Sequence, residues 1–202
     1  MKFATLIIKK YFSTIILILL ILDSFSVDNS IDSLFLKLEN AKDTNKVILL
    51  NQICSRYQYN HPDKAIKWGL KAYQKAKSIK YYKGMIRSLH LLGIVNQNNN
   101  EFENARRYYQ LAYYYSKQSD DKNNMAKSLG SIGILESNQG HFYSAIEYFK
   151  KTLPIFEDLN DTMSIAICYQ NIAYNHNMKG EKEKALKIFY DVLEIGEKKN
   201  HK

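Results

Sequence analysis

The sequence predicts an all-α protein, an α-solenoid of antiparallel helix pairs. Its 202 residues include only 8 Gly and 2 Pro, too few for the frequent turns of a β-sandwich or barrel. Apolar residues make up 46% of the chain, enough for a packed core. One sequence block recurs four times and places alanine at Ala65, Ala105, Ala145 and Ala185. This unbroken spacing of 40 residues is typical of a repeat architecture, here with about four units.

The N-terminal segment has the pattern of an export signal. Three lysines precede an uncharged apolar run over residues 11–22, which as a helix would be about 18 Å long, shorter than a bilayer core of roughly 30 Å. The small residues at 24 and 26 predict cleavage after Ser26, so residues 1–26 are expected to be a signal peptide. The mature protein would then be extracytoplasmic, either periplasmic or secreted. The alternative is an uncleaved segment that anchors the protein in a membrane.

Residues 27–45 are expected to form a leading helix ahead of the repeat domain, residues 46–202. Leu34, Leu38 and Ala41 follow helical spacing on one side of this segment. Such a helix would cover the apolar end of the repeat stack.

Each repeat unit is expected to contain two helices. In the third unit, apolar and small residues follow the spacing of one buried stripe per helix: Leu129, Ile132 and Gly133, then Ala145, Phe149 and Thr152. Small residues also recur on the first helices, at Gly93, Gly133 and Ala173, twelve positions before the alanines. We expect these small residues to face the alanines, so that the two helix axes approach closely.

Turn and cap residues place the helix boundaries. Residues that tolerate the left-handed conformation precede the second helices, at Asn60, Asn100, Gly140 and Gly180. Pro62 suits the first position of a helix, where its missing N–H costs nothing. Asp120 or Asp121, and then Asn160 or Asp161, are expected to cap first helices.

The repeat resembles the tetratricopeptide repeat. In the second unit the resemblance rests on Leu92-Gly93, Asn100-Glu101-Phe102, Ala105, Tyr109 and Ala112. The usual tetratricopeptide period is 34 residues, so each unit here has about six more, which we expect to lengthen the second helix and its exit loop. This longer variety resembles the sensory repeat arrays found ahead of bacterial histidine kinases and transcriptional regulators. The resemblance covers residues 46–199.

The resemblance implies a superhelix whose first helices line a concave groove that binds a protein or peptide. The candidate groove residues are Arg87, His90, Ile94, Gln97, Asn98, Lys127, Ile134, Asn138, Gln170, Tyr174 and Asn177. A row of amide side chains recurs about one repeat apart, at Asn98, Asn138 and Asn177. Such a ladder could bind the backbone of an extended peptide. Arg87, His90 and Lys127 favour an acidic ligand. The clamp with which chaperone-binding tetratricopeptide domains hold a C-terminal carboxylate is absent, since Leu50 and Cys54 occupy two of its positions.

The sequence predicts a binding protein rather than an enzyme. No Ser or Cys has a base at motif spacing, and there is no Gly-rich phosphate loop. The five histidines occupy different phases of the repeat, so we expect loop or surface imidazoles and no metal site or cofactor. The net charge of +9 does not by itself indicate nucleic acid, which is not expected as a partner. A second hypothesis is the input module of a signalling protein, without its output domain.

Two further features are expected to be structural. The stretch from Arg106 to Tyr115 is rich in Arg and Tyr, but Tyr109 falls on the buried stripe and only one or two rings should be exposed. Cys54 and Cys168 lie on first helices three units apart, too distant for the Cα separation of about 4.4–6.8 Å that a disulfide needs.

Overall fold

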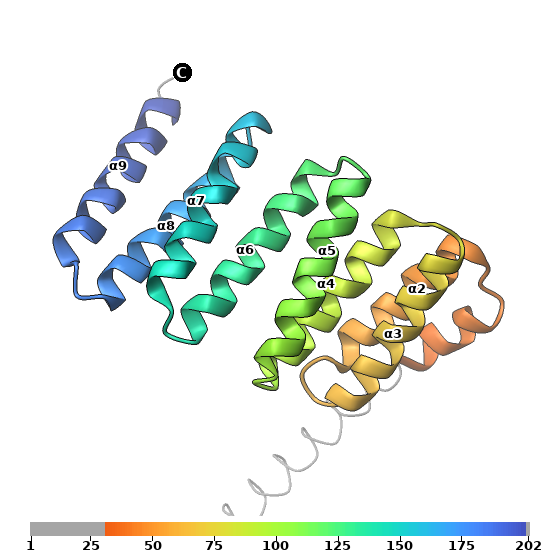
Figure 1. The fold of residues 1–202 in the computed structure, drawn as a ribbon. Helices are drawn as coiled ribbons and strands as arrows, with labels where there is room; N and C mark the ends of the chain where they lie inside the picture. The colour runs from red at the N-terminus through yellow and green to blue at the C-terminus, as the bar shows by residue number, and fades with distance from the viewer. Residues whose placement is uncertain (1–30, 201–202) are drawn as a thin grey trace, which may run out of the picture.

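The computed structural model describes residues 31–200, and every regular element in this range is a helix. The helices pair as antiparallel hairpins that stack side by side in chain order (Figure 1). The α-solenoid of four repeats is therefore confirmed. The predicted signal peptide lies outside the described residues. Within those residues, no helix is both long and apolar enough to span a bilayer.

The four repeats follow a short leading helix. Residues 31–39 are helical, with Ile31 buried and Leu34 and Leu38 half-buried. The repeats consist of the pairs α2 (Asp43–Tyr57) and α3 (Pro62–Ser78), α4 (Tyr82–Asn98) and α5 (Phe102–Gln118), α6 (Lys122–Asn138) and α7 (Phe142–Asp158), and α8 (Thr162–Met178) and α9 (Lys182–Asn200).

The extra length of the repeat is shared by both helices. Each helix from α4 to α8 has 17 residues, and the turns at 99–101 and 119–121 have the same length. The expectation that the second helix and its exit loop would take up the extra residues is therefore wrong. Lengthening both helices equally keeps the two antiparallel partners matched along their whole length.

Most of the predicted turn residues have the expected conformation. Asn100, Gly140 and Gly180 have φ values of 62°, 79° and 83°, in the left-handed region. In the second repeat this lets the Glu101 amide donate to the carbonyl of Asn96, a bond that closes the helix end. Asn60 is an exception, because α2 ends at Tyr57 and the His61 amide bonds back over four residues instead of five.

The caps agree with the sequence. Asp121 and Asp161 accept hydrogen bonds from the Asn124 and Ser164 amides at 3.0 and 3.1 Å, and Pro62 begins α3.

Within a repeat, an aromatic ring packs against a glycine. A methyl group at Gly93 would overlap the ring of Tyr109, which is 1% exposed. A methyl group at Gly133 would lie 3.1 Å from the Phe149 ring. The expected contact of Gly133 with Ala145 is therefore replaced: the glycine makes room for the ring four residues further along the second helix.

In the first three repeats, the alanine of the second helix packs against the following repeat. Ala65, Ala105, Ala145 and Ala185 are all buried, as is Ala173 on a first helix. Ala105 shares a buried cluster with Ile132 and Leu135 of the following repeat, and Ala145 shares one with Ile172. The small side chain lets the next first helix approach closely. The other predicted core residues of the third unit are buried except Leu129, which is half-buried.

The ring-on-glycine contact gives a testable difference between two glycines. Gly93→Ala forces a methyl group into a ring that the core holds in place, and should reduce the free energy of unfolding by about 1–3 kcal/mol. Gly130→Ala, in the interior of α6, meets its nearest atom at 4.0 Å and should instead stabilise the protein by about 0.5–1 kcal/mol. Urea unfolding followed by circular dichroism measures both. Similar effects of the two substitutions would contradict the packing described.

Candidate functional site

The first helices form the inner side of the solenoid. The backbones of α2 and α4, of α4 and α6, and of α6 and α8 approach within 8 Å (Cα–Cα), whereas the described second helices meet only through side chains, such as Tyr73 and Tyr115. The first helices are therefore closer together across repeats, so the stack curves around them. A ligand on this side can therefore contact several repeats at once.

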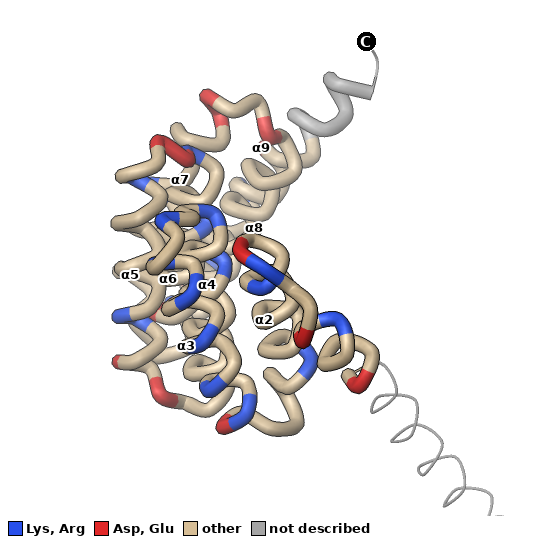
Figure 2. Tube along the Cα trace, turned by 90° about the vertical axis from the view of Figure 1, so that its right-hand side faces the viewer, with Lys and Arg blue, Asp and Glu red and all other residues tan. Residues whose placement is uncertain are grey.

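A hollow of about 1370 Å³ opens among the leading helix, α2, α4 and α6. Five cations line it: Lys37, Arg56, Lys83, Arg87 and Lys127. None of its lining residues is Asp or Glu. Figure 2 shows the same imbalance more widely, since Lys and Arg positions outnumber Asp and Glu positions along α2, α3, α4 and α6. We call this cavity the basic hollow.

The basic hollow brings together part of the predicted groove. Arg87, His90, Ile94 and Lys127 line it. Gln97 lies one turn further along α4, where it accepts a hydrogen bond of 2.9 Å from the Tyr109 hydroxyl.

The remaining predicted groove residues do not line the hollow. Asn98, Asn138 and Asn177 are exposed at the C-terminal ends of α4, α6 and α8. Ile134, Gln170 and Tyr174 are also exposed, further along the stack.

Asn51 is one of the lining residues that the sequence did not predict, as are the cations Lys37, Arg56 and Lys83. It is 6% exposed, and its side-chain oxygen has no hydrogen-bond partner in the structure. A buried amide oxygen without a partner is costly, and a donor that enters the hollow would relieve this cost. Its position on the inner face of α2 depends on how the leading helix covers that face. The 40-residue pattern carries no signal for this.

His90 is a half-buried imidazole on α4, which corrects the expectation of a loop or surface position. Its Nε2 lies 3.0 Å from the Ser128 hydroxyl of α6, and its ring packs on Tyr109. Burial, followed by the nearby charges of Arg87 and Lys127, lowers the pKa of His90 to about 4. His90 is thus neutral at pH 7 and adds no charge to the hollow, whereas Arg87 and Lys127 are exposed cations.

The two cysteines are buried and Arg106 is paired. Cys54 and Cys168 are free, and burial raises the pKa of the Cys54 thiol to about 11 and also raises that of Cys168. Arg106 forms an ion pair with Glu136 of the next repeat, so it is not a free cation of the Arg- and Tyr-rich stretch. In that stretch Tyr109 is core, as predicted, and Tyr114 is exposed. No group of His, Cys, Asp and Glu in the described part of the chain is arranged to hold a metal ion.

The environment of His90 predicts a pH dependence of stability. Its folded pKa of about 4 lies below the unfolded value, so protonation favours the unfolded chain, and this stability is lost as the pH falls from about 6.5 to about 4. His90→Gln, which keeps a side-chain donor for Ser128, should remove about 2 kcal/mol of the stability difference between pH 7 and pH 4.5. Urea unfolding at both pH values measures it, with exposed His61→Gln as control. Identical acid profiles of wild type and His90→Gln would contradict the assigned environment.

Comparisons with known proteins agree with this architecture. A family model described as tetratricopeptide repeat matches residues 84–158 and again 124–198, together more than half of the chain. No curated protein matches the sequence.

Several solved structures have the same fold. Aspartyl phosphate phosphatase F from Bacillus subtilis is 21% identical with a TM-score of 0.72, and the match covers 79% of this chain and 42% of that one. A Rap protein complexed with competence and sporulation factor is 16% identical with a TM-score of 0.71, over 85% of this chain and 50% of that one. MamA protein is 23% identical with a TM-score of 0.60, over 89% and 87% of the two chains.

At these identities the likeness shows the fold alone, and this chain spans half or less of the length of the first two proteins. The family match, the 40-residue register and the stacked helix pairs lead to one conclusion: the chain belongs to the tetratricopeptide repeat family.

Proposed function

We propose that the protein is a non-enzymatic scaffold that binds a protein or peptide partner in the basic hollow of its concave side. The observation that carries this proposal is the composition of the hollow: five cations, no carboxylate, and the buried unpaired oxygen of Asn51. A surface of one charge sign attracts a ligand of the opposite sign. The partner segment is therefore acidic.

The hollow suits an extended segment with its backbone exposed. Asn51, Gln52, Gln58 and Asn124 surround the cations, and amide side chains both donate to and accept from a peptide backbone. A backbone N–H that reaches Asn51 would satisfy its unpaired oxygen. Carboxylates of the segment would bind Arg87 and Lys127, which lie on adjacent first helices.

A structural neighbour supports binding as the role of this fold. The Rap protein of similar fold was solved in complex with competence and sporulation factor. That complex also favours a second candidate function, in which the hollow is the input site of a signalling protein. Both candidates need the same binding surface. We further propose that residues 1–26 direct the protein out of the cytoplasm, with an uncleaved membrane anchor as the alternative.

Charge at the hollow predicts which peptides bind. Ten-residue peptides rich in Asp and Glu should bind with at least ten-fold higher affinity than the same peptides with Asn and Gln, because charge-assisted hydrogen bonds contribute about 1.5–3 kcal/mol each. Raising the salt concentration should lower the affinity of the protein for the acidic peptides. Fluorescence anisotropy with labelled peptides measures both effects.

Variants locate the site. The double variant Arg87→Ala/Lys127→Ala should lose about ten-fold or more in affinity for the acidic peptide. Lys182→Ala/Lys187→Ala on α9 removes the same charge away from the hollow and is the matched control. The triple variant Asn98→Ala/Asn138→Ala/Asn177→Ala tests the exposed ladder instead. A loss confined to the triple variant would move the site out of the hollow, and equal losses in the double variant and its control would leave only a non-specific charge effect.

A further inference from the structure

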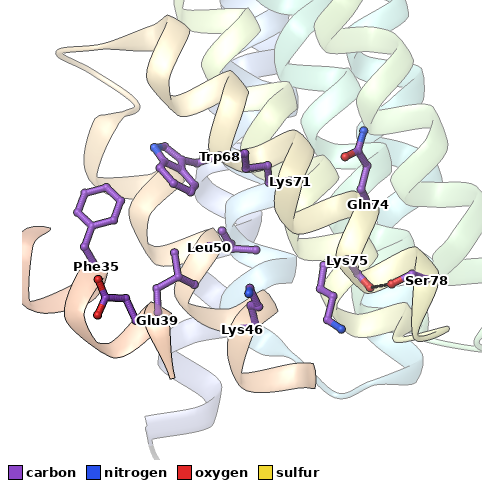
Figure 3. Close-up of a pocket in the computed structure, with 10 residues that line it drawn as sticks. Phe35, Glu39, Lys46, Leu50, Trp68, Lys71, Gln74, Lys75 and Ser78 are labelled. Carbon is purple, nitrogen blue, oxygen red and sulfur yellow. Dashed lines mark hydrogen bonds between the residues drawn. The ribbon is translucent and has the colours of Figure 1, made fainter. Parts of the chain in front are cut away.

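A second cavity, of about 660 Å³, lies between the leading helix, α2 and α3 (Figure 3). Its apolar surface comes from Phe35, Leu38, Leu50 and Trp68, with the Phe35 and Trp68 rings 5.3 Å apart. In Figure 3, Leu50 of α2 lies between Phe35 and Glu39 on one side and Gln74 and Lys75 on the other. We call this cavity the tryptophan pocket.

The tryptophan pocket is separate from the basic hollow. The two share no lining residue. On α2, Lys46 and Leu50 contribute to the pocket, whereas Val47 and Asn51 contribute to the hollow. One residue of separation along a helix turns the side chain by about 100°, so the two cavities lie on different faces of α2.

In the next repeat, side chains of the protein itself fill the equivalent place. Between α3 and α5, the side chains of Tyr73, Tyr108, Leu111 and Tyr115 pack over Ile86 and Leu89 as one apolar cluster. The 40-residue register places Lys46 at the position of Ile86, Trp68 at that of Tyr108, Lys71 at that of Leu111 and Lys75 at that of Tyr115. The first repeat therefore keeps one aromatic ring and replaces three apolar side chains with lysines.

These lysines are not neutralised within the pocket. Lys46 is half-buried, and Glu39 is the one carboxylate among the lining residues. Lys75 lies 3.6 Å from Asp43, but that carboxylate is 77% exposed, and an ion pair of this kind contributes little. Lys71 packs its ammonium 4.4 Å above the Trp68 ring and so covers one side of the pocket.

We propose that the tryptophan pocket binds a small amphipathic anion, a carboxylate with an aliphatic or aromatic body. The body packs against Phe35, Leu50 and Trp68, where it replaces the tyrosine side chains that fill the next repeat. The carboxylate binds Lys46 and Lys75 and balances the excess of positive charge in a lining that has three lysines and one carboxylate, Glu39. A volume of this size lies within the usual range of small-molecule sites, about 300–1,000 Å³.

Trp68 gives a direct readout, because it is the single tryptophan of the chain. Octanoate has both parts of the proposed ligand, 1-octanol lacks the charge, and acetate lacks the body. Octanoate should change the fluorescence of Trp68 saturably, and 1-octanol and acetate should each bind at least ten-fold more weakly. No saturable change with octanoate, or equal affinity for 1-octanol, would overturn the proposal.

Two variants of the full chain test the role of charge. Lys46→Met/Lys75→Met keeps the apolar stems and brings the pocket closer to the composition of the next repeat, so the helices should remain folded. It should weaken octanoate binding by about ten-fold or more and leave 1-octanol unaffected. Lys151→Met is the control for loss of a lysine outside the pocket, since Lys151 lies over Tyr148 in the third repeat. Unchanged octanoate affinity in the double variant, with helicity retained, would refute the assignment of the lysines.

Discussion

The packing of a second-helix ring on a first-helix glycine determines the geometry of the repeats that contain it. Tyr109 on Gly93 and Phe149 on Gly133 fix how close the two helices of a hairpin lie. The alanine four residues before each ring then faces the following repeat, where it packs with Ile132 or Ile172. One short stretch of the second helix thus sets both distances in the stack: the ring sets the spacing within a repeat, and the alanine sets the spacing between repeats. A solenoid with contacts only between neighbours needs both to propagate.

The fold followed from the sequence because its signals are local and repeated. Alanine spacing, the cap at Asp121 and the left-handed turn at Gly140 each depend on residues within one or two turns of helix. The left-handed conformation predicted for Asn60 is wrong because α2 ends at Tyr57, before the position that the 40-residue register indicates. The partner of Gly133 was misidentified because spacing shows which residues share a face, but not which of two neighbours on that face, Ala145 or Phe149, reaches across.

The candidate site was less predictable because it depends on contacts between repeats. Arg87 and Lys127 were identified as groove positions, and the basic hollow does bring them together. The burial of His90 depends on Ser128 of another repeat, 38 residues away, and its lowered pKa depends on that burial and on two flanking cations. Asn51 lies in the first repeat, which matches the repeat pattern least well, and its environment includes the leading helix. Periodicity describes what the repeats share, whereas both cavities arise where the first repeat differs.

The leading helix accounts for that difference. Its residues 31–39 occupy the place of a preceding second helix, yet the only apolar side chains that they supply to the tryptophan pocket are Phe35 and Leu38, where the next layer has Tyr73 among a cluster of aromatic side chains. Its other side carries Lys37 and Leu34 toward the basic hollow. One short helix therefore contributes to both cavities, and α2 separates them. Because the core clusters of the later repeats, such as that of Ala145, Phe149 and Ile172, contain no residue of the leading helix, the solenoid can hold its shape while this end varies. Substitutions on the leading helix that change the binding chemistry at this end therefore leave the core clusters of the later repeats intact.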